Sequence, residues 1–341
     1  MKSFAWKPAT SIRNAAETAT AITAEAMTGA IEGLAAIVKA GGIDLLDLMK
    51  EGLLAPASIV NLRNVPGLDA ITQDKEGSLH IGAMTTLADL SSHPLIRGSY
   101  LALADAVGAS ASPQIRNVAT LGGNLLQRPR CWYFRSGAYH CLRKGGGHCF
   151  ALEGENQYHA IFSNRPCAIV HPSTAATVLV ALDAAIILAG PDEVRRVTLR
   201  DFFVASDRDI QRENDLRPHE ILTEIVLPPV SVGTRMAHLR HSEKQAFDWP
   251  LADVAVRLEL APDGICKSAT VVLGAAAPIP HRAESAASAL IGKRIDATVA
   301  ADAARAALDG ATPLSGNAYK LPLFETLTRR TILKALELQK L

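Results

Sequence analysis

The chain of 341 residues is longer than one hydrophobic core usually supports, so we expect two or three domains. Hydrophobic residues make up 48% and charged residues 20% of the sequence, which is ordinary for a globular protein. A formal net charge of +1 argues against nucleic acid as a partner. The lack of an apolar run of about 18 residues argues against membrane insertion.

The N-terminal segment does not resemble a secretory signal. Its basic residues Lys2, Lys7 and Arg13 are not followed by a continuous apolar stretch. By its own sequence the chain is therefore predicted to be cytoplasmic. It would reach the periplasm only if it were exported while bound to a partner that carries a signal.

The first half of the chain alternates between strand-like and helix-like segments. In chain order we predict a strand at 34–38, a helix at 44–50, strands at 58–62 and 79–84, helices from 87 and at 100–107, and an apolar strand at 118–121. Residues 128–168 break this pattern, because they are rich in Cys, Arg, Gly and aromatic residues and show no clear period. We therefore predict an irregular insert there.

The second half adds further strands and helices. We predict a helix at 175–182, strands at 185–188, 194–199 and 221–227, a hairpin of 251–260 and 268–273, and helices at 283–290, 299–308 and 324–339. Pro228-Pro229 marks a domain boundary. Because no regular βαβ rhythm appears, the pattern favours an α+β fold over a doubly wound sheet.

Two glycine pairs indicate a place for phosphate. Lys39-Ala40-Gly41-Gly42-Ile43-Asp44 lies between a predicted strand and a helix N-terminus, where backbone N–H groups and the helix dipole favour a pyrophosphate. Thr120-Leu121-Gly122-Gly123-Asn124 has the same small, polar character. Each could equally be a tight turn without a ligand, but two such turns could grip one extended dinucleotide. Neither a Rossmann fingerprint nor a P-loop is present.

Three ordered segments, 40–46, 112–117 and 120–124, resemble the FAD-binding medium subunit of the xanthine dehydrogenase, or molybdenum hydroxylase, family. Within that family they are most similar to the flavin subunits of bacterial periplasmic aldehyde oxidoreductases. The resemblance implies a two-lobed FAD-binding domain of the vanillyl-alcohol-oxidase (PCMH) type in residues 1–228. A small α+β C-terminal domain of the CO dehydrogenase flavoprotein type would occupy residues 229–341.

The resemblance also implies a set of FAD contacts. Carried over by position, these are Lys39, Ala40, Gly41, Gly42, Ile43, Asp44, Leu45, Leu46, Ser110, Thr120, Gly122, Gly123, Asn124, Thr174, Leu222 and Arg240. Three of them depart from the family pattern. Ile43 replaces a usual Thr, Thr174 stands where an Asp is common, and Arg240 replaces a typical Lys while keeping its charge.

Four cysteines, Cys131, Cys141, Cys149 and Cys167, fall in the insert, with nine, seven and seventeen residues between them. Without a signal sequence, such clustering points to metal rather than disulfides. Four thiolates suit a [4Fe-4S] cluster or, less well, a Cys₄ zinc site, and neighbouring histidines leave a mixed site open. The resemblance includes an iron–sulfur insert at this place and favours [4Fe-4S]. Cys266 is expected to be a core residue.

No complete acid–base or nucleophile constellation stands out, so we predict no catalytic side chain and leave the chemistry to a cofactor. The resemblance implies two partners, a small [2Fe-2S] subunit and a large molybdenum-cofactor subunit, with electrons passing through FAD to an external acceptor. The alternatives are a free-standing flavin oxidoreductase of the same fold and a non-catalytic iron–sulfur docking subunit. We expect the cluster to order the insert rather than to relay electrons.

Overall fold

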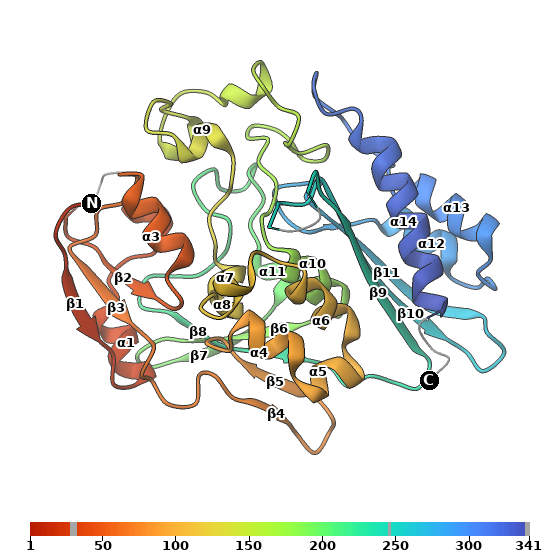
Figure 1. The fold of residues 1–341 in the computed structure, drawn as a ribbon, viewed down its shortest axis with the longest axis horizontal. Helices are drawn as coiled ribbons and strands as arrows, with labels where there is room; N and C mark the ends of the chain where they lie inside the picture. Colours follow the sequence, from red (N-terminus) through yellow and green to blue (C-terminus); the bar gives the residue numbers. More distant parts are fainter. Residues whose placement is uncertain (28–32, 245–246, 338–341) are drawn as a thin grey trace.

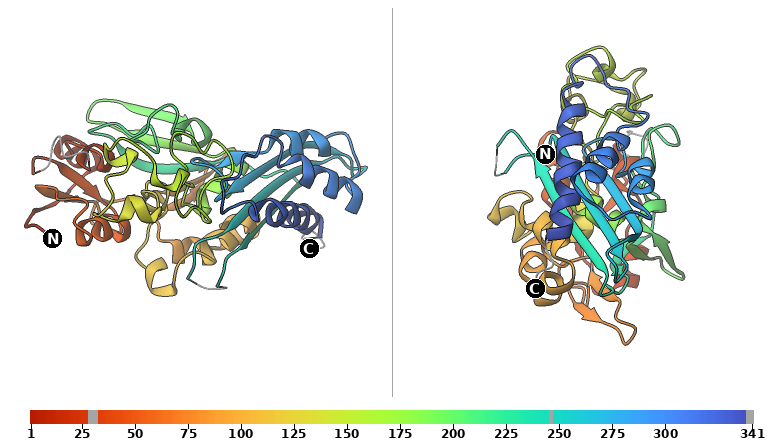
Figure 2. Two further views of the ribbon diagram at one scale, coloured as in Figure 1. Left: turned by 90° about the horizontal axis from the view of Figure 1, so that it is seen from above. Right: turned by 90° about the vertical axis from the view of Figure 1, so that its right-hand side faces the viewer.

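The computed structural model describes residues 1–27, 33–244 and 247–337, which form two lobes and a C-terminal domain (Figure 1). Each part is built around its own β-sheet. Seen from above, the first lobe and the C-terminal domain lie at opposite ends of an elongated molecule (Figure 2). The predicted α+β class is confirmed.

The first lobe is a parallel sheet of order β1-β3-β2 covered by helices on both faces. Side chains alternate across it: Ile37 and Ile59 pack towards α3, whereas Val60 packs towards α1. Its elements are β1 (Ala5–Pro8), α1 (Ile12–Thr18), α2 (Thr23–Ala26), β2 (Ala36–Lys39), α3 (Ile43–Lys50) and β3 (Ser58–Asn61).

The second lobe is an antiparallel sheet of order β4-β5-β8-β6-β7. Its central strand β8 pairs with β5 on one side and β6 on the other, so Leu79 lies opposite Leu227. The strands are β4 (Ile71–Gln73), β5 (Leu79–Gly82), β6 (Ala185–Ala189), β7 (Val194–Thr198) and β8 (Ile221–Leu227). The helices are α4 (Leu87–Ser92), α5 (Pro94–Ser99), α6 (Leu101–Gly108), α7 (Pro113–Arg116), α8 (Leu121–Leu125), α10 (Thr174–Ala181) and α11 (Leu199–Phe202).

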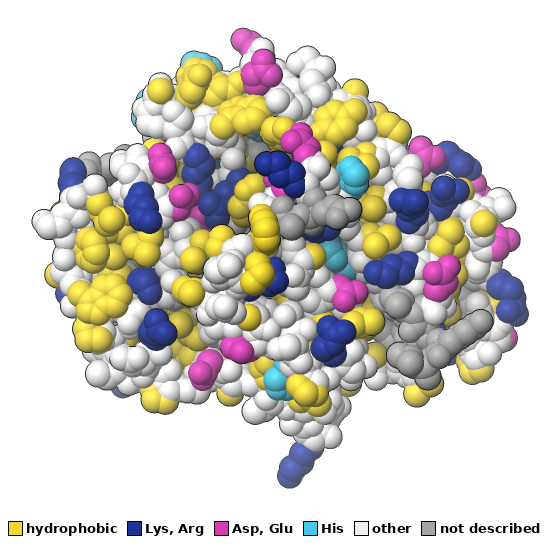
Figure 3. All heavy atoms as spheres, viewed as in Figure 1, with side chains coloured by type: hydrophobic (Ala, Val, Ile, Leu, Met, Phe, Trp, Pro, Cys, Tyr) yellow, Lys and Arg dark blue, Asp and Glu magenta, His cyan; other side chains and the backbone are white. Residues whose placement is uncertain are grey.

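The insert follows α8 and lies at the top of the molecule in Figure 1. As predicted, most of it has no regular structure. It contains only α9 (Trp132–Arg135) and two short 3₁₀ helices, η1 (Leu142–Lys144) and η2 (Phe150–Leu152). Hydrophobic side chains gather on its surface (Figure 3), and its buried residue Phe134 packs against the first lobe beside Leu48 and Met49.

The C-terminal domain is an antiparallel sheet of order β12-β11-β10-β9 with helices packed against it. Its elements are β9 (Thr234–His241), β10 (Ala252–Leu260), β11 (Cys266–Gly274), β12 (His281–Arg282), α12 (Glu284–Leu290), α13 (Ala297–Ala306) and α14 (Lys320–Glu337). Cys266 is buried in its core, as expected. Pro228 and Pro229 lie in the connection between β8 and β9.

Helix α10 joins the second lobe to the C-terminal domain. All eight of its residues are buried, which explains why its sequence is apolar all round. Thr177 donates a hydrogen bond of 2.8 Å to Asp253 of β10, and the other Asp253 oxygen lies 2.5 Å from Nε2 of His238. This buried polar chain fixes α10 against the sheet, since an unpaired carboxylate there would be costly.

Several elements differ from their prediction. The apolar segment at 118–121 is not a strand, because Thr120 caps helix α8 and starts it there. Strands β1 and β9 were missed, since Ala5–Pro8 ends on a proline and Thr234–His241 carries two Arg and two His side chains. The helix predicted at 324–339 starts at Lys320, and its last two residues lie outside the described part of the chain. Within the described residues, no helix has the length and apolarity to cross a membrane.

The β5–β8 pairing predicts a pH dependence of stability. His80 lies 3.1 Å from Asp74 and also contacts Glu224, and these hydrogen bonds, Glu224 first, raise its pKa. The protonated form is therefore favoured in the folded protein. Its contribution is fully present below the unfolded pKa of about 6.5 and is lost as the pH rises through the folded value.

We therefore expect His80→Gln to lower the melting temperature at pH 5.5 and to change it little at pH 8.5. Thermal unfolding of both proteins at the two pH values measures this. An equal loss at both pH values would show that the charge on His80 does not contribute.

Candidate cofactor-binding site

The first glycine turn connects β2 to α3. Gly42 has φ +89°, a left-handed conformation that favours glycine, and it caps α3 without a side-chain hydrogen bond. The amides of the first turn of α3 therefore have no capping side chain, which leaves them for a ligand. The strand, glycine turn and helix predicted from the sequence are therefore present, and the anion site at the helix N-terminus stays a prediction.

Gly41 brings the first turn against the second glycine element. A Cβ placed on Gly41 would lie 2.1 Å from the carbonyl oxygen of Val118 and 3.2 Å from Cα of Ala119. On the other side of this contact, a Cβ on Gly123 would lie 3.8 Å from Cβ of Ala40. The two segments, far apart in the sequence, are therefore in direct backbone contact.

The second glycine pair is part of a helix rather than a turn after a strand. Thr120 is the N-cap of α8, and its Oγ1 accepts a hydrogen bond of 3.1 Å from the Gly123 amide. A Cβ on Gly122 would approach Cβ and O of Ala83 to 2.8 and 2.9 Å. Gly122 is thus required by close packing, and the predicted turn after a strand is wrong, because the glycine pair lies in a helix. Its contact with FAD stays a prediction.

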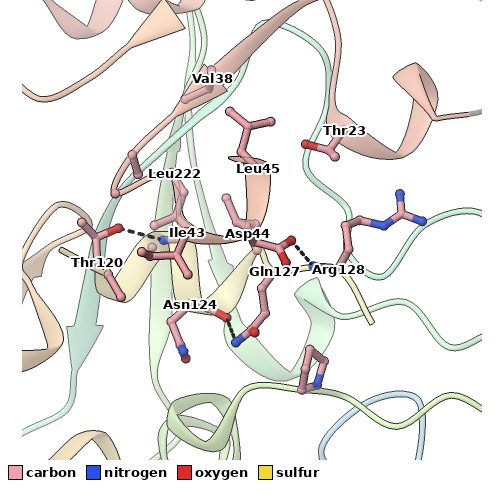
Figure 4. Close-up of a pocket in the computed structure, with 18 of the residues that line it drawn as sticks. Thr23, Val38, Ile43, Asp44, Leu45, Thr120, Asn124, Gln127, Arg128 and Leu222 are labelled. Atoms are coloured by element: carbon pink, nitrogen blue, oxygen red, sulfur yellow. Dashed lines mark hydrogen bonds between the residues drawn. The ribbon is translucent and has the colours of Figure 1, made fainter. Parts of the chain in front are cut away.

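Both glycine elements face one cavity of about 450 Å³ (Figure 4). Every FAD contact predicted from the sequence lines this cavity except Leu46, which packs against the core of the first lobe. In Figure 4, Thr120 lies on the left, Ile43 and Asp44 in the middle, and Thr23 and Arg128 on the right. The first glycine turn is thus seen between side chains of the second lobe and of the first lobe.

Some of the predicted contacts also hold the site together. Lys39 donates to the carbonyl of Ala40 at 3.0 Å and lies across Gly42, and burial lowers its pKa. Asn124 accepts a hydrogen bond of 2.6 Å from Ser173, which also caps α10. Ser110, Thr174, Leu222 and Arg240 complete the predicted lining from the second lobe and β9.

Asp44 connects the first lobe to the insert. Its carboxylate accepts from the Arg128 amide at 2.8 Å and pairs with Arg130 at 2.8 Å and Arg135 at 2.6 Å. The Asp44 carboxylate is therefore bound by the arginine-rich entry of the insert. Only the backbone of Asp44 remains for the predicted contact with the cofactor.

Several parts of the lining were missed. They include Ala19 and 21–24 of the first lobe, the insert entry with Gln127, Arg128 and Arg130, residues 212–214, 216–217 and 219–221 before and within β8, and residues 247–250 between β9 and β10. Trp249 stacks on Arg130, with the guanidinium carbon 4.8 Å from the ring centroid. None of these segments carries a local pattern that marks a ligand site, and only the tertiary structure brings them to the cavity.

The four cysteines of the insert lie in one region. Cys149 hydrogen-bonds to Cys167, and Cys131 interacts electrostatically with both Cys167 and Cys141. Burial raises the pKa of Cys131 to about 12, whereas the hydrogen bond from Cys149 and the nearby Arg143 lower the pKa of Cys167. His159, not a predicted ligand, has Nε2 3.2 Å from Sγ of Cys131.

The metal prediction is not supported by this arrangement. Across residues 1–27, 33–244 and 247–337, no three or more His, Cys, Asp or Glu side chains converge on a point where one metal ion could bind. A Cys₄ zinc site needs four sulfurs at about 2.3 Å from a single ion. The zinc alternative, and equally the mixed Cys/His alternative, therefore receives no support from the geometry.

Two protein families match the chain. Residues 3–230 match the FAD binding domain in molybdopterin dehydrogenase, and residues 237–335 match the CO dehydrogenase flavoprotein C-terminal domain. The chain therefore belongs to the family of FAD-binding subunits of molybdenum hydroxylases, and it is an oxidoreductase subunit.

Individual relatives agree with this family. The aldehyde oxidoreductase FAD-binding subunit PaoB of Escherichia coli (strain K12) is 36% identical over 250 residues, which is 72% of this chain and 76% of that protein. The carbon monoxide dehydrogenase medium chain of Hydrogenophaga pseudoflava is 29% identical over 86% of each chain. Quinoline 2-oxidoreductase from Pseudomonas putida 86 has a similar structure, with a TM-score of 0.73, 25% identity and coverage of 99% of both chains.

The residues at the cavity fit the FAD that this family binds. An uncapped helix N-terminus suits a pyrophosphate. Five buried guanidinium nitrogens of lining residues have no hydrogen-bond partner within the described structure: Nε and Nη1 of Arg128, Nε of Arg130, Nε of Arg212 and Nη2 of Arg240. The matched descriptions name FAD; they name no iron–sulfur cluster, so the predicted [4Fe-4S] cluster gains no support from them.

Gly41 provides a direct test of the FAD site. Gly41→Ala would place a methyl group against the Val118 carbonyl, so we expect separation of the two glycine elements, a loss of about 1–3 kcal/mol of stability and much weaker flavin binding. Flavin absorbance of the purified protein and thermal unfolding measure the two effects.

The matched control is Gly98→Ala in α5, where a Cβ meets nothing within 4 Å. This variant should keep its flavin and its stability. Full flavin occupancy in Gly41→Ala would show that the close approach is not needed for binding.

Proposed function

We propose that the chain is the electron-transfer subunit of a heteromeric molybdenum hydroxylase. Electrons from the [2Fe-2S] clusters of a small subunit would reach the FAD held here and leave to an external acceptor, while a large molybdenum-cofactor subunit oxidises the substrate. The observation that carries this proposal is the cavity, whose glycine elements suit a dinucleotide and whose carboxylates Asp44, Asp47, Glu213 and Glu220 pair with arginines, while Asp248 accepts backbone amides.

Those carboxylates are poorly suited to act on a substrate. Glu213 pairs with Arg143 at 2.7 Å, and Glu220 pairs with Arg195 at 2.6 Å. Asp44 is held by Arg130 and Arg135. A general base needs a carboxylate that is free to accept a proton from substrate, so this lining favours electron transfer over a free-standing oxidase that transforms its own substrate.

FAD, when bound, supplies the redox chemistry. The protein's own part is binding and orientation. The α3 amides would hold the pyrophosphate, Gly41 and Gly122 allow close backbone packing around it, and Arg240 offers a positive charge at the cavity. Residues 247–250 would restrict access of water from the side of the C-terminal domain.

The substrate class proposed for the complex is an aldehyde. Support comes from the relative with 36% identity, whose name is that of an aldehyde oxidoreductase subunit. Xanthine dehydrogenase subunits are also relatives, at 25% identity, and make a purine the alternative substrate. In either case the substrate contacts would lie on the large subunit.

A comparison of the isolated chain with the complex tests the proposal. The purified chain should bind about one FAD, and aldehyde should not bleach its flavin absorbance, because the oxidising centre is on another subunit. Adding the small and large subunits should make bleaching by aldehyde fast. Aldehyde oxidation by the isolated chain would instead support the free-standing oxidoreductase, and a chain that binds no flavin would support the docking subunit.

We propose separately that the insert holds a [4Fe-4S] cluster through Cys131, Cys141, Cys149 and Cys167. In such a cluster each thiolate binds a different iron, so the four sulfurs need not converge on one point. The cysteines gather in one region and are buried or half-buried, with Arg143 and Lys144 beside them. The support is that four cysteine thiolates are suitable ligands for such a cluster. The expected role of the cluster is to order the insert.

Metal analysis tests this second proposal. Anaerobically purified protein should contain about four iron and four sulfide per chain, and Cys149→Ser should lose most of both. Cys266→Ser, which changes a thiol in the distant C-terminal core, should leave the iron content unchanged. Iron-free protein from iron-replete cells would overturn the cluster and leave the flavin proposal untouched.

A further inference from the structure

The insert is attached to the C-terminal domain through two short segments. The exit segment of the insert, residues 156–164, lies beside the strap, residues 312–319, which leads into α14 (Figures 1 and 2). Asn156 accepts the Gly316 amide at 2.8 Å and donates to Oγ of Ser315 at 3.1 Å. We call this contact between the exit segment and the strap the latch.

The centre of the latch is buried and polar. Asn317 of the strap is fully buried, and its Nδ2 donates to the carbonyls of His159 and Ala160, each at 3.1 Å. Lys320, the first residue of α14, is fully buried as well. Its Nζ donates to the carbonyl of His159 at 3.1 Å and to that of Ala275, just after β11, at 2.7 Å. One amine therefore joins α14, the exit segment and the C-terminal sheet.

Lys320 lies where a positive charge is unfavourable. Both of its acceptors are neutral carbonyls, and within the described residues no carboxylate pairs with it. It also stands at the N-terminus of an 18-residue helix, where the helix dipole disfavours a cation. A neutral amine has two N–H groups for the two carbonyls, whereas an ammonium has a third that also needs an acceptor. Burial accordingly lowers the pKa of Lys320 to about 7.

The other titratable groups of the latch keep one charge state near neutral pH. Besides Lys320, the exit segment, the strap, residues 275–280 and the first turn of α14 contain only Tyr158, His159 and Tyr319. Burial first, and the nearby Lys320 second, lower the pKa of His159 to about 4. A hydrogen bond to a carboxylate raises the pKa of Tyr158 to about 12, and burial raises the pKa of Tyr319. Lys320 is therefore the group of the latch that changes charge between pH 7.0 and pH 8.5.

We propose that Lys320 makes the latch pH-sensitive, so that the C-terminal domain is held more tightly to the insert as the pH rises above neutrality. The inference does not depend on what the cysteines of the insert bind. Lys320 is a positioning residue, because it holds backbone carbonyls of two parts of the chain together and touches no reacting group.

The direction of the effect follows from proton uptake. In the open latch the amine is in water with its ordinary pKa of 10.5, so the open state binds more protons than the closed state between about pH 7 and that value. Opening therefore becomes easier as the pH falls through this range. Below about pH 7 both states carry the proton, and the pH dependence ends.

The latch acts on two parts of the molecule. Leu314 of the strap packs beside Cys131 and Trp132 of the insert. The C-terminal domain, which the strap belongs to, contributes Arg240 and residues 247–250 to the cavity. Opening of the latch would thus loosen the cover over the cysteines and one wall of the cavity.

Hydrogen exchange of the purified full chain tests the latch. Amide protection is measured by mass spectrometry at pH 7.0 and pH 8.5 and corrected for the intrinsic exchange rate at each pH. We expect the protection of residues 156–164 and 312–320 to be about tenfold lower at pH 7.0, because the open state gains the proton. The protection of β3 in the first lobe should stay the same. Equal latch protection at both pH values would overturn the proposal, and so would an equal fall in β3, which would indicate global unfolding.

Substitutions at Lys320 test whether this residue is responsible. Lys320→Met keeps the length of the side chain, and Lys320→Gln keeps a neutral N–H donor, but neither can titrate. In whichever of the two folds, latch protection should be the same at both pH values. Lys334→Met is the matched control on the same helix, since Lys334 is partly exposed and lies 3.8 Å from Asp105. It should keep the tenfold difference, and a Lys320 variant that also keeps it would refute the assignment.

Discussion

The contact between Gly41 and the Val118 carbonyl is the constraint on which the cofactor site depends. Only hydrogen fits between these two backbones, since a Cβ would lie 2.1 Å from the oxygen. The contact places the first turn of α3 beside the N-terminus of α8. The uncapped amides of α3 and the N-terminus of α8, which Thr120 caps, therefore line the same cavity. Chemistry at this site is thus fixed by main-chain geometry, and side chains such as Ile43 can depart from the family pattern without removing the donors.

The insert also holds the two lobes in place around the cavity. Its entry segment supplies Arg128, Arg130 and Arg135, which reach the first lobe through Asp44, while Phe134 packs into that lobe's core. Arg128 and Arg143 share the buried Glu213, which precedes β8 of the second lobe. Buried pairs of this kind stabilise little in themselves, but removing one partner leaves an uncompensated charge. The insert therefore connects the two lobes through these ion pairs and through Phe134, independently of what its cysteines bind.

Local features were predictable from the sequence and long-range ones were not. The first glycine turn is a strand, two glycines and a helix in succession, and each part has its own pattern, so both its structure and its role were predicted. The second glycine pair was assigned correctly to the cavity but to the wrong element, because Thr120 as a cap outweighs the apolar residues before it. Thr23, Arg128 and Trp249 were missed as lining residues, since nothing near them in the sequence marks a ligand. The cysteine spacing indicated a common location, which the structure has, but spacing alone does not fix the geometry of a metal site.

The pairing of β5 with β8 has a consequence for biosynthesis. Leu79 and Leu227 are neighbours in the sheet, so the second lobe cannot complete its central pairing until roughly two thirds of the polypeptide has left the ribosome. Such distant pairings form slowly, because a long loop must close before any contact is gained. The cavity needs residues before β5, within β8 and beyond β9, and so it is assembled late. Flavin loading is therefore expected after translation, on a nearly finished chain, and the supply of free FAD at that moment would limit how much mature subunit accumulates.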